Sequence, residues 1–493
     1  MPPRPEEENF IRRRAKSVTQ AEEIQQIEAK VRHSQPDKPC HKPRDSLFSW
    51  ASGFRNFSGL INWAFLLLFM GSVRLFLENL IKYGIRVDPQ QWFTVLLDDA
   101  AGRHHHFHPS LILLIFTSVP VMFCLLIEKG LHQEVIPNRV GMTAHVVNLM
   151  VLVLTPIVAL QLYPSYFSLV GASVVCFAYS VIFLKLWSYV HVNSWCREDY
   201  QLNTVNKTNV RRQSLSVNKY ALSNGKKPPI SPPSLNSLVH YPQNLNIRDI
   251  SYFILAPTLC YELNFPRTDR IRKRFLVKRV LELLVGMQVM ASLFQQWIIP
   301  CVKNSLIPFS NMDVAKATER LLKLAIPNHL LWLIFFYLMF HSALNVVGEL
   351  LHFADRNFYS DWWNANNIDT FWRNWNFPVH QWAVRHLYCP LLKLGFKRGS
   401  ATFFVFFTSA FFHEYMVSVP LRTFKVYAFM GMMFQIPLSV LCHKIEKKFG
   451  PPWGNIIVWS SLIMSHPLCI MTYYHDYIIT HFGKRLLEEF SSL

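Results

Sequence analysis

One apolar stretch of the sequence contains two ionisable side chains among hydrophobic residues. Residues 401–420 read ATFFVFFTSAFFHEYMVSVP, in which His413 and Glu414 follow a run rich in phenylalanine. About 20 such residues suffice to cross a bilayer as a helix. A charge near the bilayer centre costs about 2.5–3.5 kcal/mol on insertion scales, so this pair requires a polar environment inside the protein. A histidine held neutral there can accept a proton, which makes His413 a candidate general base.

The neighbours of His413 leave two interpretations open. Ser409 lies four residues earlier, on the same helix face, so the two residues are compatible with a serine–histidine nucleophile pair. Alternatively, the serine hydroxyl bonds to its own helix and the histidine makes a hydrogen bond between helices. Position 417 is Val417 rather than a second histidine, so the pattern is not that of a zinc protease.

The composition places these residues in a membrane protein. The chain has 493 residues, of which 51% are hydrophobic and 16% are charged, whereas a soluble chain averages about 25% charged residues. These values exclude a soluble globular enzyme, a disordered protein, a collagen-like chain and a disulfide-rich scaffold. The formal charge of +19 favours basic loops facing anionic lipid over nucleic-acid binding. The nine cysteines include no Cys-x-x-Cys pair, which argues against structural zinc.

Hydrophobic runs predict an all-α, polytopic membrane protein with about nine transmembrane helices. Residues 1–45 are polar and typical of a disordered tail, 46–480 are predicted as the membrane-embedded domain, and 481–493 as a short C-terminal tail. The predicted spans lie near 59–81, 109–128, 140–163, 165–190, 276–301, 321–348, 401–420, 424–442 and 454–475.

The distribution of charge predicts the orientation of these spans. Residues 194–248 form a long polar loop rich in Lys and Arg, which the positive-inside rule places in the cytoplasm. Four predicted spans precede this loop, so we expect the N-terminus on the same side and the C-terminus on the opposite side. Residues 349–400, with five tryptophans, are then cytoplasmic and are predicted as amphipathic interfacial helices. The histidines within 104–108 indicate a loop rather than a metal site, because no other ligands lie near them.

Two motifs resemble those of a known family. Residues 358–364 read FYSDWWN and resemble the FYxDWWN signature of the sterol and diacylglycerol acyltransferase branch of the membrane-bound O-acyltransferases. Residues 409–415, which contain His413, resemble the invariant-histidine segment of that family. Stretches at 45–48, 74–84, 256–266 and 418–422 resemble the diacylglycerol acyltransferase subgroup. The resemblance covers roughly residues 45–480.

The resemblance implies a fold and a reaction. Membrane-bound O-acyltransferase helices enclose a reaction chamber inside the membrane, where an acyl group passes from acyl-CoA to a lipid hydroxyl. The implied acceptor is diacylglycerol, and the product is triacylglycerol. His413 would take the proton from the hydroxyl, which attacks the thioester directly, and Asn376 would stabilise the oxyanion. Acyl-CoA is then a substrate, and neither a cofactor nor a metal is implied.

Further site residues follow from the same resemblance. Lys397 and Arg398 have two interpretations, as cations that bind the CoA phosphates or as anchors at the membrane surface. His466 stands where the family pattern predicts glutamine, so contacts to the acceptor lipid can differ here. The FYxDWWN motif is either an acyl-CoA element or a structural brace near CoA; its residues are Phe358, Tyr359, Asp361, Trp362, Trp363 and Asn364. The residues expected to line the site or lie near the acyl-CoA are Trp375, His380, Tyr388, Ser409, Glu414 and Gln435.

The resemblance also implies a multi-pass protein of the endoplasmic reticulum membrane that assembles as a homo-oligomer, either a dimer or a tetramer. Three other functions stay open at this stage. A sterol acyltransferase of the same branch would use a different acceptor. A transporter or channel would use His413 and Glu414 in a proton or ion path. A lipid-binding scaffold would bind diacylglycerol without releasing CoA.

Overall fold

The computed structural model describes residues 58–92, 108–214 and 239–491, and most of these residues are helical. Residues 1–75 and 76–493 form two units, and every contact described below lies within the second. The longer helices are α2 (Ser58–Tyr83), α5 (Ser118–His132), α6 (Asn138–Leu162), α7 (Leu169–Ser214), α9 (Lys273–Leu293), α12 (Val314–Phe336), α17 (Arg398–Leu421), α18 (Tyr427–Phe449) and α19 (Pro451–Ser491). The shorter ones are α4 (Pro109–Phe116), α8 (Ile247–Leu255), α10 (Ile299–Lys303), α11 (Leu306–Ser310), α13 (Leu344–Leu350), α14 (Ile368–Trp375), α15 (Phe377–Ala383) and α16 (Cys389–Lys393).

The prediction of an all-α polytopic protein is confirmed, but the count of nine spans is not. Seven helical segments among the described residues are long and apolar enough to cross a membrane. They are Pro109–His132, Asn138–Leu162, Leu169–Leu202, Val314–Leu350, Arg398–Leu421, Tyr427–Phe449 and Pro451–His481, and each overlaps a predicted span. The predicted spans 59–81 and 276–301 are also helical. The first corresponds to α2, and the second corresponds to α9 together with the π-turn Phe294–Ile298 and α10 that follow it. The first ten residues of α9 include five charged side chains, which lower its hydropathy.

Several predicted boundaries differ from the structure. The predicted loop 194–248 begins as helix, since α7 continues to Ser214, and it ends in the first turn of α8; residues 215–238 lie outside the described residues. The predicted C-terminal tail 481–493 is helical through Ser491 as part of α19. The predicted tail 1–45 and the histidines at 104–106 also fall outside the described residues.

The aromatic segment 349–400 forms short helices, and its interfacial position stays a prediction. Asparagine side chains cap the N-termini of two of these helices. Asn367 accepts a hydrogen bond from the Thr370 N–H at 2.8 Å at the start of α14, and Asn376 accepts one from the Val379 N–H at 3.3 Å at the start of α15. Such N-caps satisfy amide groups that a helix cannot satisfy itself, so these residues set where the helices begin.

Two wide π-turns lie directly before prolines. The π-turn η4 (Phe294–Ile298) is followed by Pro300, and η7 (Val384–Tyr388) is followed by Pro390. Proline has no N–H to donate to the carbonyl four residues earlier, and its ring clashes with that carbonyl. Widening the preceding turn moves the carbonyl away, so the helices continue past the prolines instead of ending there.

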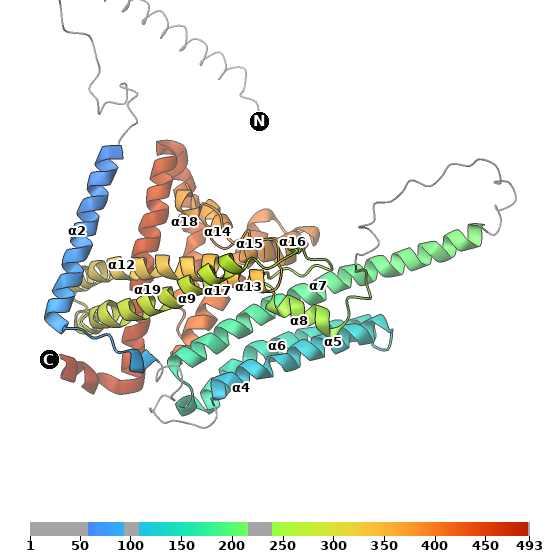
Figure 1. The fold of residues 1–493 in the computed structure, drawn as a ribbon, viewed down its shortest axis with the longest axis horizontal. Helices are drawn as coiled ribbons and strands as arrows, with labels where there is room; N and C mark the ends of the chain where they lie inside the picture. The colour runs from blue at the N-terminus through green and yellow to red at the C-terminus, as the bar shows by residue number, and fades with distance from the viewer. Residues whose placement is uncertain (1–57, 93–107, 215–238, 492–493) are drawn as a thin grey trace, which may run out of the picture. The chain divides into compact units, whose positions relative to one another are not determined.

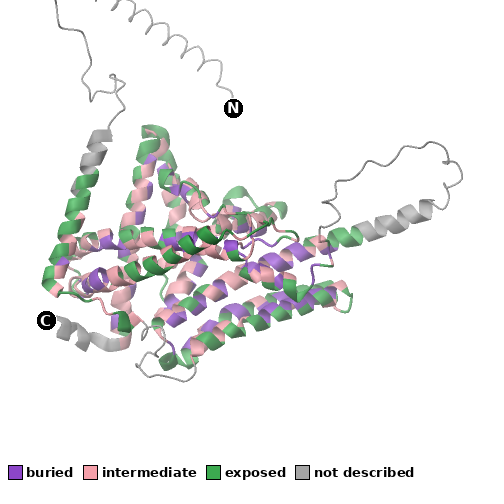
Figure 2. Cartoon of the chain, in the orientation of Figure 1, coloured by how far each residue is buried: buried purple, intermediate pink, exposed green. Residues whose placement is uncertain are grey.

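The helices α5, α6 and α7 run side by side and bury a common core (Figure 1). Figure 2 shows exposed residues along the outer sides of α5 and α6, whereas the part of α7 that packs against them is mostly buried or half-buried. These outer faces are apolar, with Phe123, Val146 and Val147 all more than half exposed, which is what lipid tails can solvate. α17 packs against both α7 and α18, and α12 packs against α19. The helix α17, which carries His413, therefore packs against helices from both halves of the chain.

A buried lysine attaches α8 to this bundle. Lys185 in α7 is 4% exposed, and its Nζ donates to the carbonyl oxygens of Phe253, Ile254 and Ala256 at 2.9, 2.8 and 2.6 Å. The carbonyls at the end of a helix lack intrahelical donors, and a cation there is also favoured by the helix dipole. Lys185 of α7 thus caps the C-terminus of α8, and these three carbonyl oxygens stabilise its ammonium group inside the protein.

A buried carboxylate holds the segment that leads to the FYSDWWN motif. Glu349 in α13 is fully buried. It accepts a hydrogen bond from the Arg272 N–H at 2.6 Å and forms ion pairs with Arg272 at 2.8 Å and Arg356 at 3.0 Å. Arg356 lies two residues before Phe358, so this interaction fixes the approach to the motif.

We expect E349Q to lower the free energy of unfolding by about 3 kcal/mol, near the lower end for removing one partner of a buried ion pair, because the half-exposed Arg272 can regain water. E319Q is a matched control, since Glu319 pairs with Lys323 on the surface of α12. Thermal unfolding in detergent measures both variants. Equal melting temperatures for E349Q, E319Q and the parent protein would show that Glu349 does not hold the segment.

Candidate functional site

The orientation of His413 is set by its own helix. Its Nδ1 lies 2.8 Å from the backbone carbonyl of Ser409, one turn earlier in α17. A carbonyl can only accept, so Nδ1 is the protonated nitrogen of the neutral ring. Nε2 then carries the lone pair. Among the described residues, no protein group forms a hydrogen bond with Nε2, and it is therefore the nitrogen that can accept a proton.

The same geometry bears on the serine–histidine interpretation. The Ser409 hydroxyl lies 3.5 Å from Nδ1, at the long limit for a hydrogen bond. Because Nδ1 already carries a proton and points it at the carbonyl, it cannot take one from the hydroxyl. The backbone of Ser409 therefore positions His413, and the arrangement disfavours Ser409 as an activated nucleophile.

His466 in α19 stands near His413, and His329 in α12 stands near His466. His466 lies within electrostatic range of both His413 and His329. The rings of His329 and His466 both pack on Trp332, with centroid distances of 5.1 and 5.6 Å. Both nitrogens of His329 and Nδ1 of His466 are buried without a hydrogen-bond partner among the described residues. Such unsatisfied buried groups are costly, so this region is suited to a polar ligand or water.

The FYSDWWN motif forms part of the core beside these histidines. Phe358 and Trp362 are 2% and 3% exposed. Trp375 stacks on Trp332 with a centroid distance of 4.5 Å and an angle of 1°, and Trp362 meets Trp375 edge-on at 5.1 Å. Aromatic pairs of this geometry add to the stability gained by burial. The motif therefore braces the helix that carries Trp375.

The other motif residues make hydrogen bonds to neighbouring segments. The hydroxyl of Tyr359 lies 2.8 Å from Nδ1 of His341 in the π-turn η5 (Tyr337–Ala343). Asp361 accepts a hydrogen bond from Asn364 at 3.4 Å. The carbonyl of Trp363 accepts hydrogen bonds from two side chains of α19, at 3.1 and 3.2 Å. These contacts favour the structural-brace interpretation, whereas contact with CoA is not tested by them.

Asn376 stands at the junction of α14 and α15. Its Oδ1 is occupied as the N-cap that accepts from Val379, which leaves its Nδ2 as the available donor. The following N–H, of Phe377, donates to the Phe358 carbonyl at 3.0 Å. The motif thus holds the junction in place, and the asparagine is oriented to donate a hydrogen bond.

Glu414 does not share the surroundings of His413. Its carboxylate accepts hydrogen bonds from the hydroxyls of Tyr473, at 2.7 and 2.8 Å, and Ser418, and from the N–H of Phe429 at 2.9 Å. These partners lie on α17, α18 and α19. Glu414 therefore holds the α17–α18 connection together, and its predicted place in the lining of the site stays a prediction.

The remaining predicted residues are less closely tied to His413. Gln435 in α18 is half-buried and its amide makes a 3.5 Å contact with the carbonyl of Gly431. Tyr388 and His380 are half-buried, and burial together with the charge of Arg373 lowers the pKa of His380. Lys397 and Arg398 are exposed at the start of α17. Fifteen residues separate Arg398 from His413, which is about 22 Å along a helix.

A polar cluster fixes η7 against α7. His386 is 2% exposed, and its Nε2 lies 2.8 Å from the Ser188 hydroxyl while its Nδ1 lies 3.3 Å from Nδ1 of His191. The neighbouring Trp382 donates to a backbone carbonyl of α7 at 2.8 Å. Burial, with the charge of Arg385 and the nearby His191, lowers the pKa of His386 to about 3.

Sequence reasoning missed His329 and the role of Trp332. The signal was present, because His329 is an ionisable residue within the predicted span 321–348, and that same test singled out His413. Among the described residues, no three His, Cys, Asp or Glu side chains cluster as metal ligands would.

The seven apolar helices define a polytopic membrane protein. The oriented His413 places a polar group within one of its membrane-spanning helices. The chain belongs to the membrane-bound O-acyltransferase family, whose sequence model matches residues 139–475. It is therefore an O-acyltransferase. The resemblance found in the sequence motifs is confirmed.

Curated relatives match nearly the whole chain. It is 46% identical over 443 residues to "Diacylglycerol O-acyltransferase 1" of Bos taurus, covering 90% of this chain and 86% of the relative. It is 45% identical over 449 residues to the protein of the same name from Homo sapiens, covering 91% and 86%. It is 36% identical over 445 residues to "Diacylglycerol O-acyltransferase 1A" of Glycine max, covering 90% and 82%.

The depressed pKa of His386 predicts acid sensitivity. The unfolded state binds a proton near pH 6.5, whereas the folded state stays neutral until about pH 3. Stability is therefore complete above pH 6.5 and falls as the pH is lowered, by about 2–3 kcal/mol at pH 4.5. We expect H386N to flatten the dependence of the melting temperature on pH between 7 and 4.5. His443 is exposed, so H443N is a control that should keep the pH dependence of the melting temperature seen in the parent protein. The assignment would be contradicted if H386N also kept the parental pH dependence.

Proposed function

We propose that this protein transfers a fatty acyl group from acyl-CoA to the free hydroxyl of diacylglycerol, giving triacylglycerol and CoA. The observation that carries the proposal is the Nε2 atom of His413, which has no protein partner among the described residues while Nδ1 is fixed by a carbonyl. Support comes from the relatives, which bear the name diacylglycerol O-acyltransferase 1 at 45–46% identity over about 90% of the chain.

The proposed reaction proceeds in one attack without an acyl-serine intermediate. Nε2 of His413 takes the hydroxyl proton as the oxygen bonds to the thioester carbonyl carbon. The Nδ2 donor of Asn376 stabilises the negative charge that develops on the carbonyl oxygen. The tetrahedral intermediate then loses its C–S bond, and the departing thiolate takes the proton back from His413. The ester, CoA and the neutral imidazole are regenerated together.

The acyl-CoA is proposed to enter from the end of α17 that carries Lys397 and Arg398. These exposed cations suit the phosphates of CoA, and the thioester must reach deep into the helix bundle to meet His413. Trp375, His380, Tyr388 and Ser409 are proposed to lie along this path, with Gln435 near its inner end. The unsatisfied nitrogens of His466 and His329 are suited to contact the polar part of the acceptor lipid.

We also propose the setting of this reaction. The enzyme lies in the endoplasmic reticulum membrane with its N-terminus in the cytoplasm and its C-terminus in the lumen, on the basis of the basic loops. It works as a homo-oligomer, either a dimer or a tetramer. Glycosylation tags at each terminus and size measurements of purified protein test these statements; a modified N-terminal tag or a monomer would contradict them.

The central test is acyl transfer by purified protein supplied with labelled acyl-CoA and diacylglycerol. H413A should lower turnover by about 10²- to 10⁴-fold, the usual contribution of a general base, with acyl-CoA binding and protein yield retained. S409A should lower turnover by less than about tenfold, because the backbone and not the hydroxyl orients the imidazole.

Three alternatives to the proposed reaction each have their own outcome in this assay. A trapped acyl-enzyme together with an inactive S409A would establish a serine nucleophile. Preference for sterol over diacylglycerol would establish the other activity of the branch. Diacylglycerol binding without release of CoA would indicate a scaffold. Substantial turnover of H413A would reject His413 as the base.

The basic pair at the start of α17 has a separate test. Neutralising both residues in K397Q/R398Q should raise the KM for acyl-CoA by about tenfold or more, since charge-assisted contacts to phosphate are lost, and leave the KM for diacylglycerol unchanged. The double variant K447Q/K448Q, near the end of α18, is a control of equal charge change. Equal effects on the two substrates would favour membrane anchoring.

A further inference from the structure

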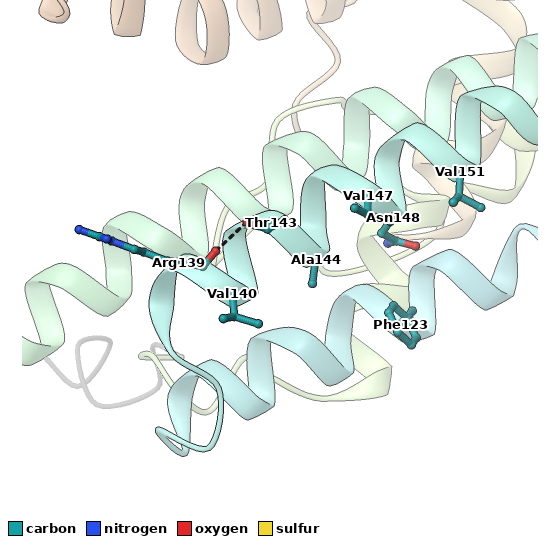
Figure 3. Close-up of a pocket in the computed structure, with 8 residues that line it drawn as sticks. All are labelled: Phe123, Arg139, Val140, Thr143, Ala144, Val147, Asn148 and Val151. Carbon is teal, nitrogen blue, oxygen red and sulfur yellow. Dashed lines mark hydrogen bonds between the residues drawn. The ribbon is translucent and has the colours of Figure 1, made fainter.

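A groove lies on the outer side of α5 and α6, apart from His413. It has a volume of about 610 Å³ and is lined mainly by apolar side chains, among them Phe123, Ala144, Val147 and Val151. Figure 3 shows Arg139 at one end of this groove and Val151 at the other. Val147 and Val151 are 55% and 50% exposed. A surface of this kind within a membrane span is open to lipid molecules.

Polar contacts behind the groove hold its two walls at a fixed spacing. Asn148 Nδ2 in α6 donates to the Pro120 carbonyl in α5 at 2.9 Å. Glu128 in α5 pairs with His145 of α6 at 3.0 Å and with Arg197 of α7 at 2.7 Å, and all three side chains are buried. The groove is therefore already formed before any ligand enters, which lowers the entropic cost of binding.

The length of the groove matches one leaflet of a bilayer. From Arg139 to Val151 the axis of α6 rises about 18 Å, and half of a hydrocarbon core of about 30 Å is about 15 Å. One acyl chain can thus follow the groove from the membrane surface toward the midplane. A transmembrane helix of a partner protein would cross both leaflets and continue past Val151, so a groove that ends at Val151 matches it less well than an acyl chain.

One cation lies at the membrane-surface end. Arg139 is exposed, and within the described residues its guanidinium forms no ion pair. It is the second residue of α6, whose preceding residue Pro137 provides no side-chain cap. The start of a helix carries partial positive charge, and the guanidinium fork matches the oxygens of a phosphate. An anionic headgroup is therefore complementary to this end, and the remaining lining carries no formal charge.

We propose that this groove binds an anionic phospholipid of the leaflet that Arg139 faces, with the phosphate on Arg139 and one acyl chain along Ala144, Val147 and Phe123. The site is distinct from the acyl-transfer centre, and its occupant is a resident lipid rather than a substrate. A neutral lipid would fill the apolar part of the groove but would leave the guanidinium without a partner.

The test uses full-length protein in phosphatidylcholine nanodiscs that contain phosphatidylserine with a photoactivatable group in its acyl chain. Irradiation should label peptides of α5 and α6 around Phe123 and Val147. R139Q should reduce this labelling by about five- to tenfold, as expected for the loss of charge-assisted hydrogen bonds. K129Q removes a neighbouring exposed cation that does not line the groove, and its labelling should match that of the parent protein.

A second pair of variants tests the apolar part. V147W fills the groove, whereas V146W places the same ring on an adjacent face that is equally exposed, at 57%. Labelling should be lost in V147W and kept in V146W. Equal labelling by a phosphatidylcholine probe, unchanged labelling in R139Q, or cross-links between two copies at this face would overturn the proposal. H413A should label like the parent protein, so failure of the acyl-transfer proposal and failure of this one are distinguishable.

Discussion

The hydrogen bond between Nδ1 of His413 and the Ser409 carbonyl is the interaction on which the candidate site depends. It joins a side chain to its own helix, so it forms whenever α17 folds and needs no partner from elsewhere. It fixes the protonated nitrogen on one side of the ring and presents the basic nitrogen on the other. The backbone of a membrane helix thus does the work for which many hydrolytic sites use a buried carboxylate.

Aromatic residues of α12 and of the FYSDWWN segment pack together beside His466. Trp332, Trp362 and Trp375 pack on one another, and the FYSDWWN backbone holds the junction that carries Asn376. Large rigid rings suit this task because they bury much apolar surface with few rotatable bonds. The motif therefore has a structural role, because it positions Asn376, the donor in the proposed reaction.

Much of the fold followed from hydrophobic run length, since seven of the predicted spans correspond to apolar helices. The separate roles of His413 and Glu414 could not be predicted from hydrophobic run length. Consecutive residues on an α-helix point about 100° apart, so adjacency in the sequence gave no reason to expect a shared environment, and Glu414 binds Tyr473 and Phe429 instead. The partners of Lys185 lie about seventy residues away, a distance over which no local pattern operates. Ionisable residues in spans are therefore easy to find in a sequence, but their partners decide which are structural.

The position of Glu414 has a consequence for the movement of protons. With its carboxylate engaged at the α17–α18 connection, no carboxylic acid in the described part of the chain forms a hydrogen bond with His413 and could receive the proton that the imidazole takes from an alcohol. In the proposed reaction that proton leaves as part of the thiol product. Each catalytic cycle is then proton-neutral, and the hydrocarbon interior needs no water wire or relay to either face of the membrane.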